Sequence, residues 1–383
     1  MSTTHNKTVS SGTARVTVRE ASVEMFYRAP LWLPNSHIQT IVPALFARLP
    51  AVSYRRERWD TPDGDFIELD WLVHEPPDGQ RRAANPAARV TVGTQPGAAH
   101  GASLTLGNPA HDGGPSSHAP LFVLFHGLEG SSASHYARTL MATARELGWH
   151  GVVPHFRSCS GPLNLLPRFY HLADSAEVDW VLRRLRETHR GPIVAAGVSL
   201  GGNVLLRWLG ERRQDASFLT AAAAISAPLD VHAGGRMLSQ GFGKIYTRSF
   251  LKTLKTKALQ KLEQYPGLFD ANAMLASRTL YEFDNVVTAP LHGFRDTDDY
   301  WTRATTRPLL PEITVPTLVL NARNDPFLPG AVLPGRHEVS AVIELDQPQH
   351  GGHVGFMTGP FPGRLDWLSQ RVFNYLSPFV DHG

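Results

Sequence analysis

The sequence predicts an α/β fold, with a mostly parallel central sheet flanked by helices, on three observations. Short apolar runs alternate with helical patterns from residue 119 onward. Most of these runs are apolar at nearly every position, which is typical of parallel strands covered by helices on both faces. The composition, with 42% hydrophobic and 19% charged residues among 383, is that of a globular chain long enough for one large core.

The N-terminal region leads from a tail into the first strands. Residues 1–20 are polar and rich in Thr and Ser, so we expect a disordered tail. Residues 31–48 predict a proline-punctuated lead-in followed by a short helix. Strands are expected around 52–59 and 66–73, and a Pro-Asp-Gly sequence supplies the turn between them.

The composition changes after this hairpin. Pro, Gly, Ala, Ser and His dominate residues 75–118, and periodic hydrophobicity disappears. Such a segment cannot bury enough apolar surface to offset the entropy of ordering its chain. We therefore expect a low-complexity surface insert at 83–118, within a single domain that spans 24–380.

The rest of the chain alternates strand and helix. The expected strands are 121–125, 151–154, 193–196, 221–225, 315–320 and 339–345, and the expected helices are 134–147, 174–188, 200–212 and 365–375. Asp174 and Glu177 have the spacing of a capping box at the start of the second helix. Residues 229–310 break the alternation, because they contain amphipathic helical stretches and no convincing strand. We expect them to form a helical lid insertion.

The strongest chemical signal is the pentapeptide Gly197-Val198-Ser199-Leu200-Gly201, which follows one expected strand and opens a helix. This context is typical of a nucleophile elbow, in which a strained turn exposes a serine near a helix N-terminus. Glycines two residues on either side of the serine allow the strand and the helix to approach closely. The sequence therefore predicts an α/β-hydrolase fold with Ser199 as nucleophile; a structural glycine turn is the alternative.

Two later loops supply an acid and a base in the chain order that this fold uses. Asp325 is the only carboxylate in the loop after 315–320, and a loop-capping role is its alternative. After 339–345, His353 follows two glycines that permit a tight loop, and His350 is its rival. We expect Asp325 to orient the imidazole of His353 while the imidazole carries the serine proton.

An oxyanion hole is expected beside this triad. The loop that begins at His126 follows strand 121–125, where this fold places its second donor. The backbone N–H groups of Leu128 and Leu200 are the expected donors to the developing oxyanion. We interpret His126 as a residue that shapes the loop rather than as a second base.

An apolar stripe in the lid has two interpretations. Its members recur at near-helical spacing: Leu238, Phe242, Ile245, Tyr246, Phe250 and Leu254. The stripe either packs the lid onto the body or forms part of an acyl pocket. In the second interpretation Phe242, Ile245, Phe294 and Trp301 are the candidate pocket residues.

Charge and motif content argue against several function classes. The net charge of +3 comes from 37 basic and 34 acidic residues, so no nucleic-acid partner is expected. The densest basic stretch is interpreted as a solvated helix face or, alternatively, as a site for anionic substrates or lipid head groups. It comprises Lys244, Arg248, Lys252, Lys255, Lys257 and Lys261.

The histidines lack acidic or cysteine partners at ligand spacing, and the Gly-rich turn lacks a P-loop lysine, so neither a metal nor a cofactor is expected. Without a secretory signal or an apolar run of 18 residues, we expect a cytoplasmic protein without integral membrane association.

Together these motifs resemble those of the YheT-like branch of the α/β-hydrolases, the bacterial relatives of the ABHD hydrolases. The resemblance covers most of the chain from about residue 24 apart from the insert. Besides the elbow and the two catalytic loops, its marks begin at Pro34, Pro62, His126, Phe156 and Thr288. It implies that Ser199, Asp325 and His353 form the triad, and it favours His353 over His350 because the family histidine follows paired glycines.

The function implied is hydrolysis of a small-molecule carboxylic ester with a short or medium acyl chain, through an acyl-enzyme intermediate. Three alternatives stay open: an alcohol O-acyltransferase that uses the same triad, a non-catalytic binding protein that retains the fold, and a peptidase. The physiological ester and the oligomeric state are not predicted.

Overall fold

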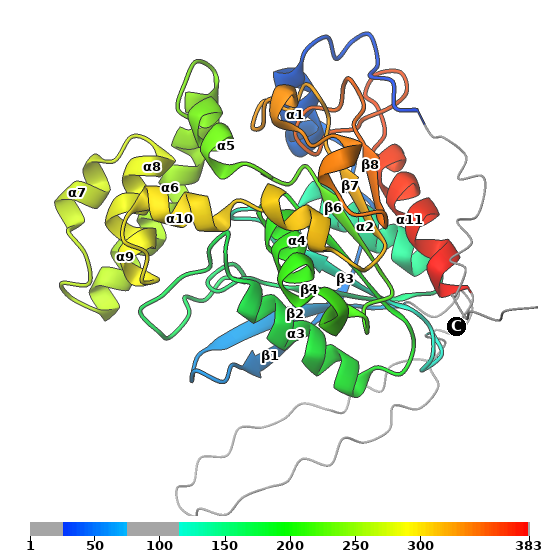
Figure 1. The fold of residues 1–383 in the computed structure, drawn as a ribbon, viewed down its shortest axis with the longest axis horizontal. Coiled ribbons are helices and arrows are strands. Elements are labelled where there is room, and N and C mark those ends of the chain that lie inside the picture. The colour runs from blue at the N-terminus through cyan, green and yellow to red at the C-terminus, as the bar shows by residue number, and fades with distance from the viewer. Residues whose placement is uncertain (1–25, 75–114, 382–383) are drawn as a thin grey trace, which may run out of the picture.

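A computed structural model describes residues 26–74 and 115–381 (Figure 1). Within them, the strands form one eight-stranded sheet in the order β1-β2-β4-β3-β5-β6-β7-β8. β1 and β2 are antiparallel to their neighbours, and every pairing from β4 to β8 is parallel. The strands are Tyr54–Asp60, Phe66–Leu72, Leu121–Phe125, His150–Pro154, Ile193–Val198, Ala221–Ile225, Thr317–Leu320 and Ile343–Asp346. The expected tail at 1–20 and all but the last residues of the expected insert lie outside the described residues.

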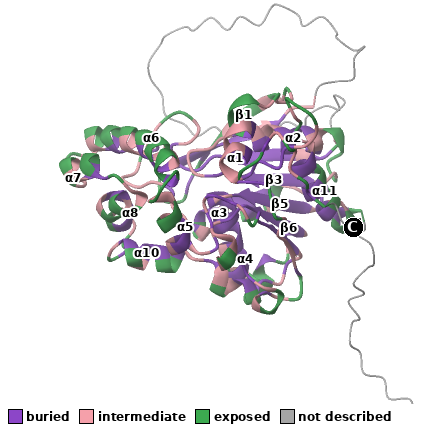
Figure 2. Cartoon of the chain, turned by 90° about the horizontal axis from the view of Figure 1, so that it is seen from above, coloured by how far each residue is buried: buried purple, intermediate pink, exposed green. Residues whose placement is uncertain are grey.

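Helices cover both faces of the sheet, as the apolar strands predicted. Leu121, Val123 and Phe125 of β3 pack in one core with α3 (Ser175–Thr188) and α4 (Leu200–Arg212). Phe122 and Leu124 pack in the opposite core with α2 (His135–Glu146) and α11 (Asp366–Val380). Figure 2 shows the resulting buried central layer. The predicted fold class, a mostly parallel sheet flanked by helices, is confirmed.

Some local predictions were wrong. The last strand begins at Ile343, because residues 339–342, where the strand was expected to start, form a bend and a turn after the short 3₁₀ turn Arg336–Glu338. Asp174 precedes α3 but makes no capping hydrogen bond. Its carboxylate instead accepts from Arg168 at 2.8 Å, so an ion pair replaces the predicted capping box.

A helical segment joins β6 to β7 and stands beside the sheet (Figure 1). It comprises α5 (Val231–Leu238), α6 (Gly243–Gln264), α7 (Ala271–Ala276), α8 (Leu280–Phe283), a π-helical turn (Asp284–Thr288), α9 (Ala289–Leu291) and α10 (Thr297–Ala304). Asn203 of α4 ties it to the body, since its side-chain amide donates to the carbonyls of Leu172 and Ala304. None of the helices in the described part of the chain has the length and apolar character needed to cross a bilayer.

The basic stretch on α6 is not one solvated face. Lys244, Arg248 and Lys252 are exposed, but Lys261 is fully buried. The Lys261 ammonium donates to the carbonyls of Asn164 and Leu166, at 2.6 and 2.9 Å. Because a buried ammonium must have acceptors, these bonds fix the C-terminal half of α6 to the loop after β4. The prediction of a single solvated stripe was therefore wrong at its C-terminal end.

Candidate active site

The turn between β5 and α4 has the backbone that a nucleophile elbow needs. Ser199 has φ 53° and ψ −116°, a conformation that a non-glycine residue rarely adopts. A Cβ at Gly197 would lie 2.4 Å from the Gly201 carbonyl oxygen, and one at Gly201 would lie 2.3 Å from the Phe125 carbonyl oxygen. Only glycine fits at either position, which is why the motif requires both.

The three side chains predicted to form the triad lie together. Ser199 Oγ is 3.0 Å from His353 Nε2, and His353 Nδ1 is 2.9 Å from Asp325 Oδ2. With Nδ1–H donating to the carboxylate, Nε2 can accept the serine proton. The Asp325 side chain is 1% exposed and that of His353 11%, so water has little access to the acid. The ring of Phe327 stacks on the imidazole at 4.0 Å and limits its rotation.

The histidine loop is held by residues from the other end of the chain. Thr40 Oγ1 accepts from the His353 N–H at 2.9 Å, and Gln39 Oε1 accepts from the Gly351 N–H at 3.0 Å. Gln39 Oε1 also accepts from Asn324, which lies beside Asp325. Reasoning from single residues missed these α1 (Ser36–Phe46) side chains as part of the site, and only the family motif that includes them could have drawn attention to them.

His350, the rival base, lies elsewhere. It is exposed, and its nearest described polar contact is the side-chain amide of Asn324, at 3.4 Å. His353 is the histidine that the two-glycine loop brings to Ser199.

The loop after β3 lies close to Ser199, since a Cβ at Gly127 would be 3.3 Å from the Cβ of Ser199. Three of its amides have acceptors inside the protein: Gly127 donates to Tyr136 Oη at 2.8 Å, Glu129 to Tyr170 Oη at 2.8 Å, and Gly130 to the Gly127 carbonyl at 2.9 Å. The Leu128 amide lies between them, and Leu128 lines the same pocket as Ser199. Leu200 is the first residue of α4, where an N–H has no intrahelical partner.

His126 shapes this loop, as its sequence position suggested. Its Nε2 accepts from the Phe156 N–H at 3.1 Å, so Nδ1 carries the proton and donates to the Gly127 carbonyl at 2.8 Å. Complete burial, together with the neighbouring His155, lowers the pKa of His126 to about 3. A permanently neutral ring with both nitrogens occupied cannot act as a second base.

Glu129 connects the same loop to the helical segment. It adopts φ 56°, and its Oε1 accepts from Tyr170 Oη and from the Lys257 ammonium, each at 2.8 Å. The Tyr170 hydroxyl thus accepts from the Glu129 N–H and donates to its carboxylate. Lys257 comes from α6, so the residue that follows Leu128 is held by both the body and the helical segment.

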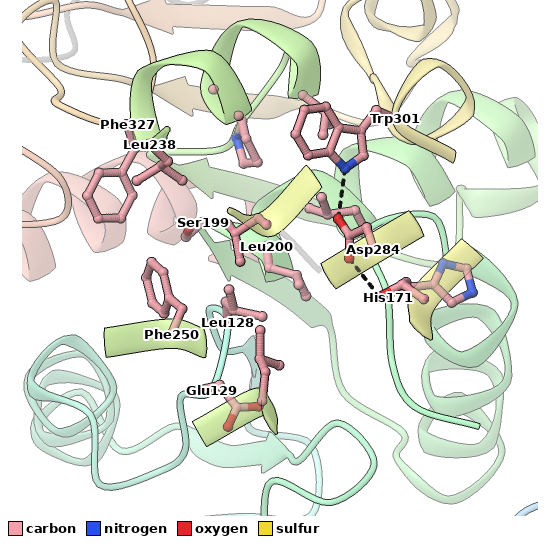
Figure 3. A pocket seen from close by; sticks show the side chains of 18 of the residues that line it. Leu128, Glu129, His171, Ser199, Leu200, Leu238, Phe250, Asp284, Trp301 and Phe327 are labelled. Atoms are coloured by element: carbon pink, nitrogen blue, oxygen red, sulfur yellow. Dashed lines mark hydrogen bonds between the residues drawn. The ribbon is translucent and has the colours of Figure 1, made fainter. Parts of the chain in front are cut away.

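A cavity opens in front of Ser199, between the sheet and the helical segment (Figure 3). It measures about 1110 Å³, including the space at its open mouth. Its wall is mainly apolar and includes Leu128, Leu238, Phe250, Leu254, Phe283, Leu328, Trp301 and Phe327. A cavity of this size and character fits an apolar group of a small ligand.

Of the four candidate pocket residues, the structure brings only Trp301 to the cavity wall. Phe242 and Ile245, at the start of α6, are 42% and 52% exposed, and the Phe242 ring lies against His37 instead of the cavity. Phe294 is buried, but it packs against Tyr300 and His171 rather than lining the cavity. These three assignments were wrong. The helical period was read correctly, but the period alone does not say which face meets the cavity.

Comparison with known proteins identifies the family. The profile described as "Alpha/beta hydrolase family" matches residues 122–363. The chain belongs to the alpha/beta hydrolase family. This hydrolase is 36% identical to "Putative esterase YheT" of Escherichia coli (strain K12) over 350 residues, which is 91% of this chain and 92% of that protein. It is 27% identical to "Phospholipase ABHD3" of Mus musculus over 360 residues, 93% of this chain and 79% of that protein. The predicted YheT-like relationship is confirmed.

Among solved structures, an esterase of Pyrococcus furiosus matches this hydrolase with a TM-score of 0.48 at 14% identity, covering 86% of this chain and 92% of that one. Within the described residues, no three His, Cys, Asp or Glu side chains are grouped so that they could hold a metal ion.

Proposed function

We propose that this hydrolase is a serine esterase that cleaves small-molecule carboxylic esters of short or medium acyl chains through an acyl-enzyme on Ser199. The observation that carries the proposal is the hydrogen-bonded series Ser199–His353–Asp325 at the floor of an apolar cavity. The names of the two relatives, an esterase and a phospholipase, support an ester as the substrate.

In the first half of the reaction, Ser199 Oγ attacks the ester carbonyl carbon while His353 Nε2 takes the hydroxyl proton. The carbonyl oxygen becomes an oxyanion, to which the Leu128 and Leu200 N–H groups donate. Asp325 stabilises the imidazolium that forms. His353 then gives its proton to the alkoxide leaving group, and the acyl group stays on Ser199.

In the second half, water gives a proton to His353 and attacks the acyl carbon. The resulting tetrahedral intermediate collapses, Ser199 Oγ recovers the proton from His353, and the carboxylic acid leaves. We assign the apolar wall formed by Leu238, Phe250 and Trp301 to the acyl chain, and we assign residues 229–310 as the lid that covers it.

The proposal is tested with a fluorophosphonate probe, which forms a covalent bond only with an activated serine. Mass spectrometry of the labelled protein should locate the adduct on Ser199, and Ser199→Ala should take no label. Esters of increasing acyl length should then be hydrolysed with an optimum at short or medium chains. Absence of labelling would contradict the proposal and favour a binding protein. Ethyl esters as the main products in the presence of ethanol would favour an acyltransferase.

A further inference from the structure

Of the two acidic side chains that line the cavity, Glu129 is paired with Lys257, and the proposed reaction makes no use of the other, Asp284. Asp284 begins the π-helical turn after α8 and lines the cavity together with Thr288 and Trp301. It lies deep in the protein yet keeps accessible surface, which faces the cavity (Figure 3). π-Helical turns are rare and frequently occur at functional sites.

The carboxylate of Asp284 is held in a fixed position. Its Oδ1 accepts from Thr288 Oγ1 at 2.6 Å, and its Oδ2 accepts from Trp301 Nε1 at 2.8 Å. Trp301 is itself fixed, because a Cβ at Gly235 of α5 would lie 2.2 Å from the indole ring. Glycine at this position lets the indole lie against α5 with its N–H directed at Asp284.

These two bonds leave acceptor capacity unused. A carboxylate offers about four lone-pair sites, and Thr288 and Trp301 fill two. None of the Lys, Arg or His side chains in the described parts of the chain forms an ion pair with Asp284. Burial without a cation raises its pKa to about 6. A purely structural joint between the π-helical turn and α10 would need only neutral acceptors, which cost less to bury than a carboxylate.

We propose that Asp284 is a specificity-determining residue that accepts a hydrogen bond from a hydroxyl group on the arm of the ester that fills the cavity. The inference rests on the proposed esterase function and narrows its substrate to hydroxylated esters. A hydroxyl suits the site better than an ammonium, because bringing a full charge into this apolar cavity costs more than bringing a neutral donor. A wholly apolar chain of the same length would remove water from the carboxylate and put nothing in its place.

The test compares kcat/KM for methyl esters with plain, ω-hydroxy and ω-methoxy acyl chains of increasing length. A second panel places the same groups on the alcohol arm of acetate esters. In one of the two panels, at the chain length that brings the hydroxyl to Asp284, kcat/KM of the hydroxylated ester should exceed that of the plain ester by about tenfold or more. The methoxy ester should show no such gain, since it cannot donate. Asp284→Asn should reduce this preference, and Asp284→Leu should reverse it.

Asp298→Asn is the matched control, because Asp298 is an exposed carboxylate on the neighbouring α10. It should leave the preference unchanged. Absence of a hydroxyl preference at every length in both panels, or a preference that Asp284→Leu retains, would overturn the inference while leaving the esterase proposal in place.

Binding provides a measurement that needs no turnover. The Ser199→Ala variant should bind the preferred ω-hydroxy ester at least tenfold more tightly than the plain ester, and Ser199→Ala/Asp284→Leu should not. Equal binding of both esters by Ser199→Ala would overturn the inference. Failure of the wild type to hydrolyse any ester or take the fluorophosphonate label would instead contradict the proposed function.

Discussion

The ammonium of Lys257 on α6 lies 2.8 Å from Oε1 of Glu129, the residue that follows the proposed oxyanion donor Leu128. The two side chains are 22% and 9% exposed, so the pair is partly shielded from water and removal of one partner leaves the other charge poorly solvated. The position of the Leu128 peptide therefore depends on a contact made by the helical segment.

Lys257→Met should accordingly lower kcat by about tenfold, corresponding to about 1.4 kcal/mol of transition-state stabilisation, with a smaller effect on KM. Glu129→Gln should have a similar effect, and the double variant should lose less than the product of the two. Lys252→Met is the control, because Lys252 is exposed on the same helix and should have no effect. A change confined to KM would indicate that the pair contacts substrate instead.

Triad variants test the roles assigned to the hydrogen-bonded series. Ser199→Ala and His353→Ala should each lower ester turnover by about a millionfold, because the members act as a unit. Asp325→Asn should cost about ten-thousandfold, since the imidazole would be held in the wrong tautomer. His350→Ala should retain activity. Steady-state kinetics on purified protein, with circular dichroism to verify folding, provide the measurement, and Ser199→Ala activity above about a tenth of wild type would contradict the mechanism.

Acyl-chain preference should respond to the cavity wall and not to the start of α6. Phe250→Ala and Leu238→Ala remove side-chain volume from the wall and so enlarge the cavity. The optimal acyl chain should therefore become longer, and each methylene that enters the new space should contribute up to about 0.8 kcal/mol of binding free energy. Phe242→Ala and Ile245→Ala change exposed side chains and should leave the optimum in place. The ratio of kcat/KM across an ester series separates the two groups. An optimum that moved with Phe242 would restore the original pocket assignment.

Asp284 should give folding stability a specific pH dependence. Its pKa is raised from 3.8 to about 6 by burial, so between these values the folded protein holds a proton that the unfolded chain has lost. The contribution is fully present below pH 3.8 and is lost as the pH rises through about 6. At about 1.4 kcal/mol per pKa unit it amounts to something on the order of 3 kcal/mol. Denaturant unfolding of wild type and Asp284→Asn should therefore differ in pH slope between about pH 4 and 6, and parallel curves would contradict the assignment.

The parts of the structure that were predictable are those that residues close in sequence determine. β3, α4 and β6 match their expected ranges, because continuous apolar runs and the glycine elbow specify them from neighbouring residues alone. Asp325 and His353 were predictable for a related reason: each follows a strand, and strand ends of a parallel sheet meet at one edge.

The parts that were missed depend on distance in space. Gln39 and Thr40 reach the histidine loop from more than 300 positions away, and nothing in their local sequence indicates a partner. Lys261 looked like a surface charge because its spacing matched the exposed lysines, whereas the loop that supplies its acceptors is remote in sequence. Phe242 was misplaced for the same reason, since the direction of a helix relative to the cavity is set by tertiary packing.

The buried ammonium of Lys261 makes α6 a fixed wall instead of a hinged flap. Swinging the helix away from the body would break the two hydrogen bonds that the ammonium donates to the Asn164 and Leu166 carbonyls, and hydrogen bonds to charged groups are among the stronger ones in proteins. In the proposed reaction the ester would enter, and the acid would leave, through the open mouth of the cavity. The proposed reaction would then need no large movement of α6 in each cycle.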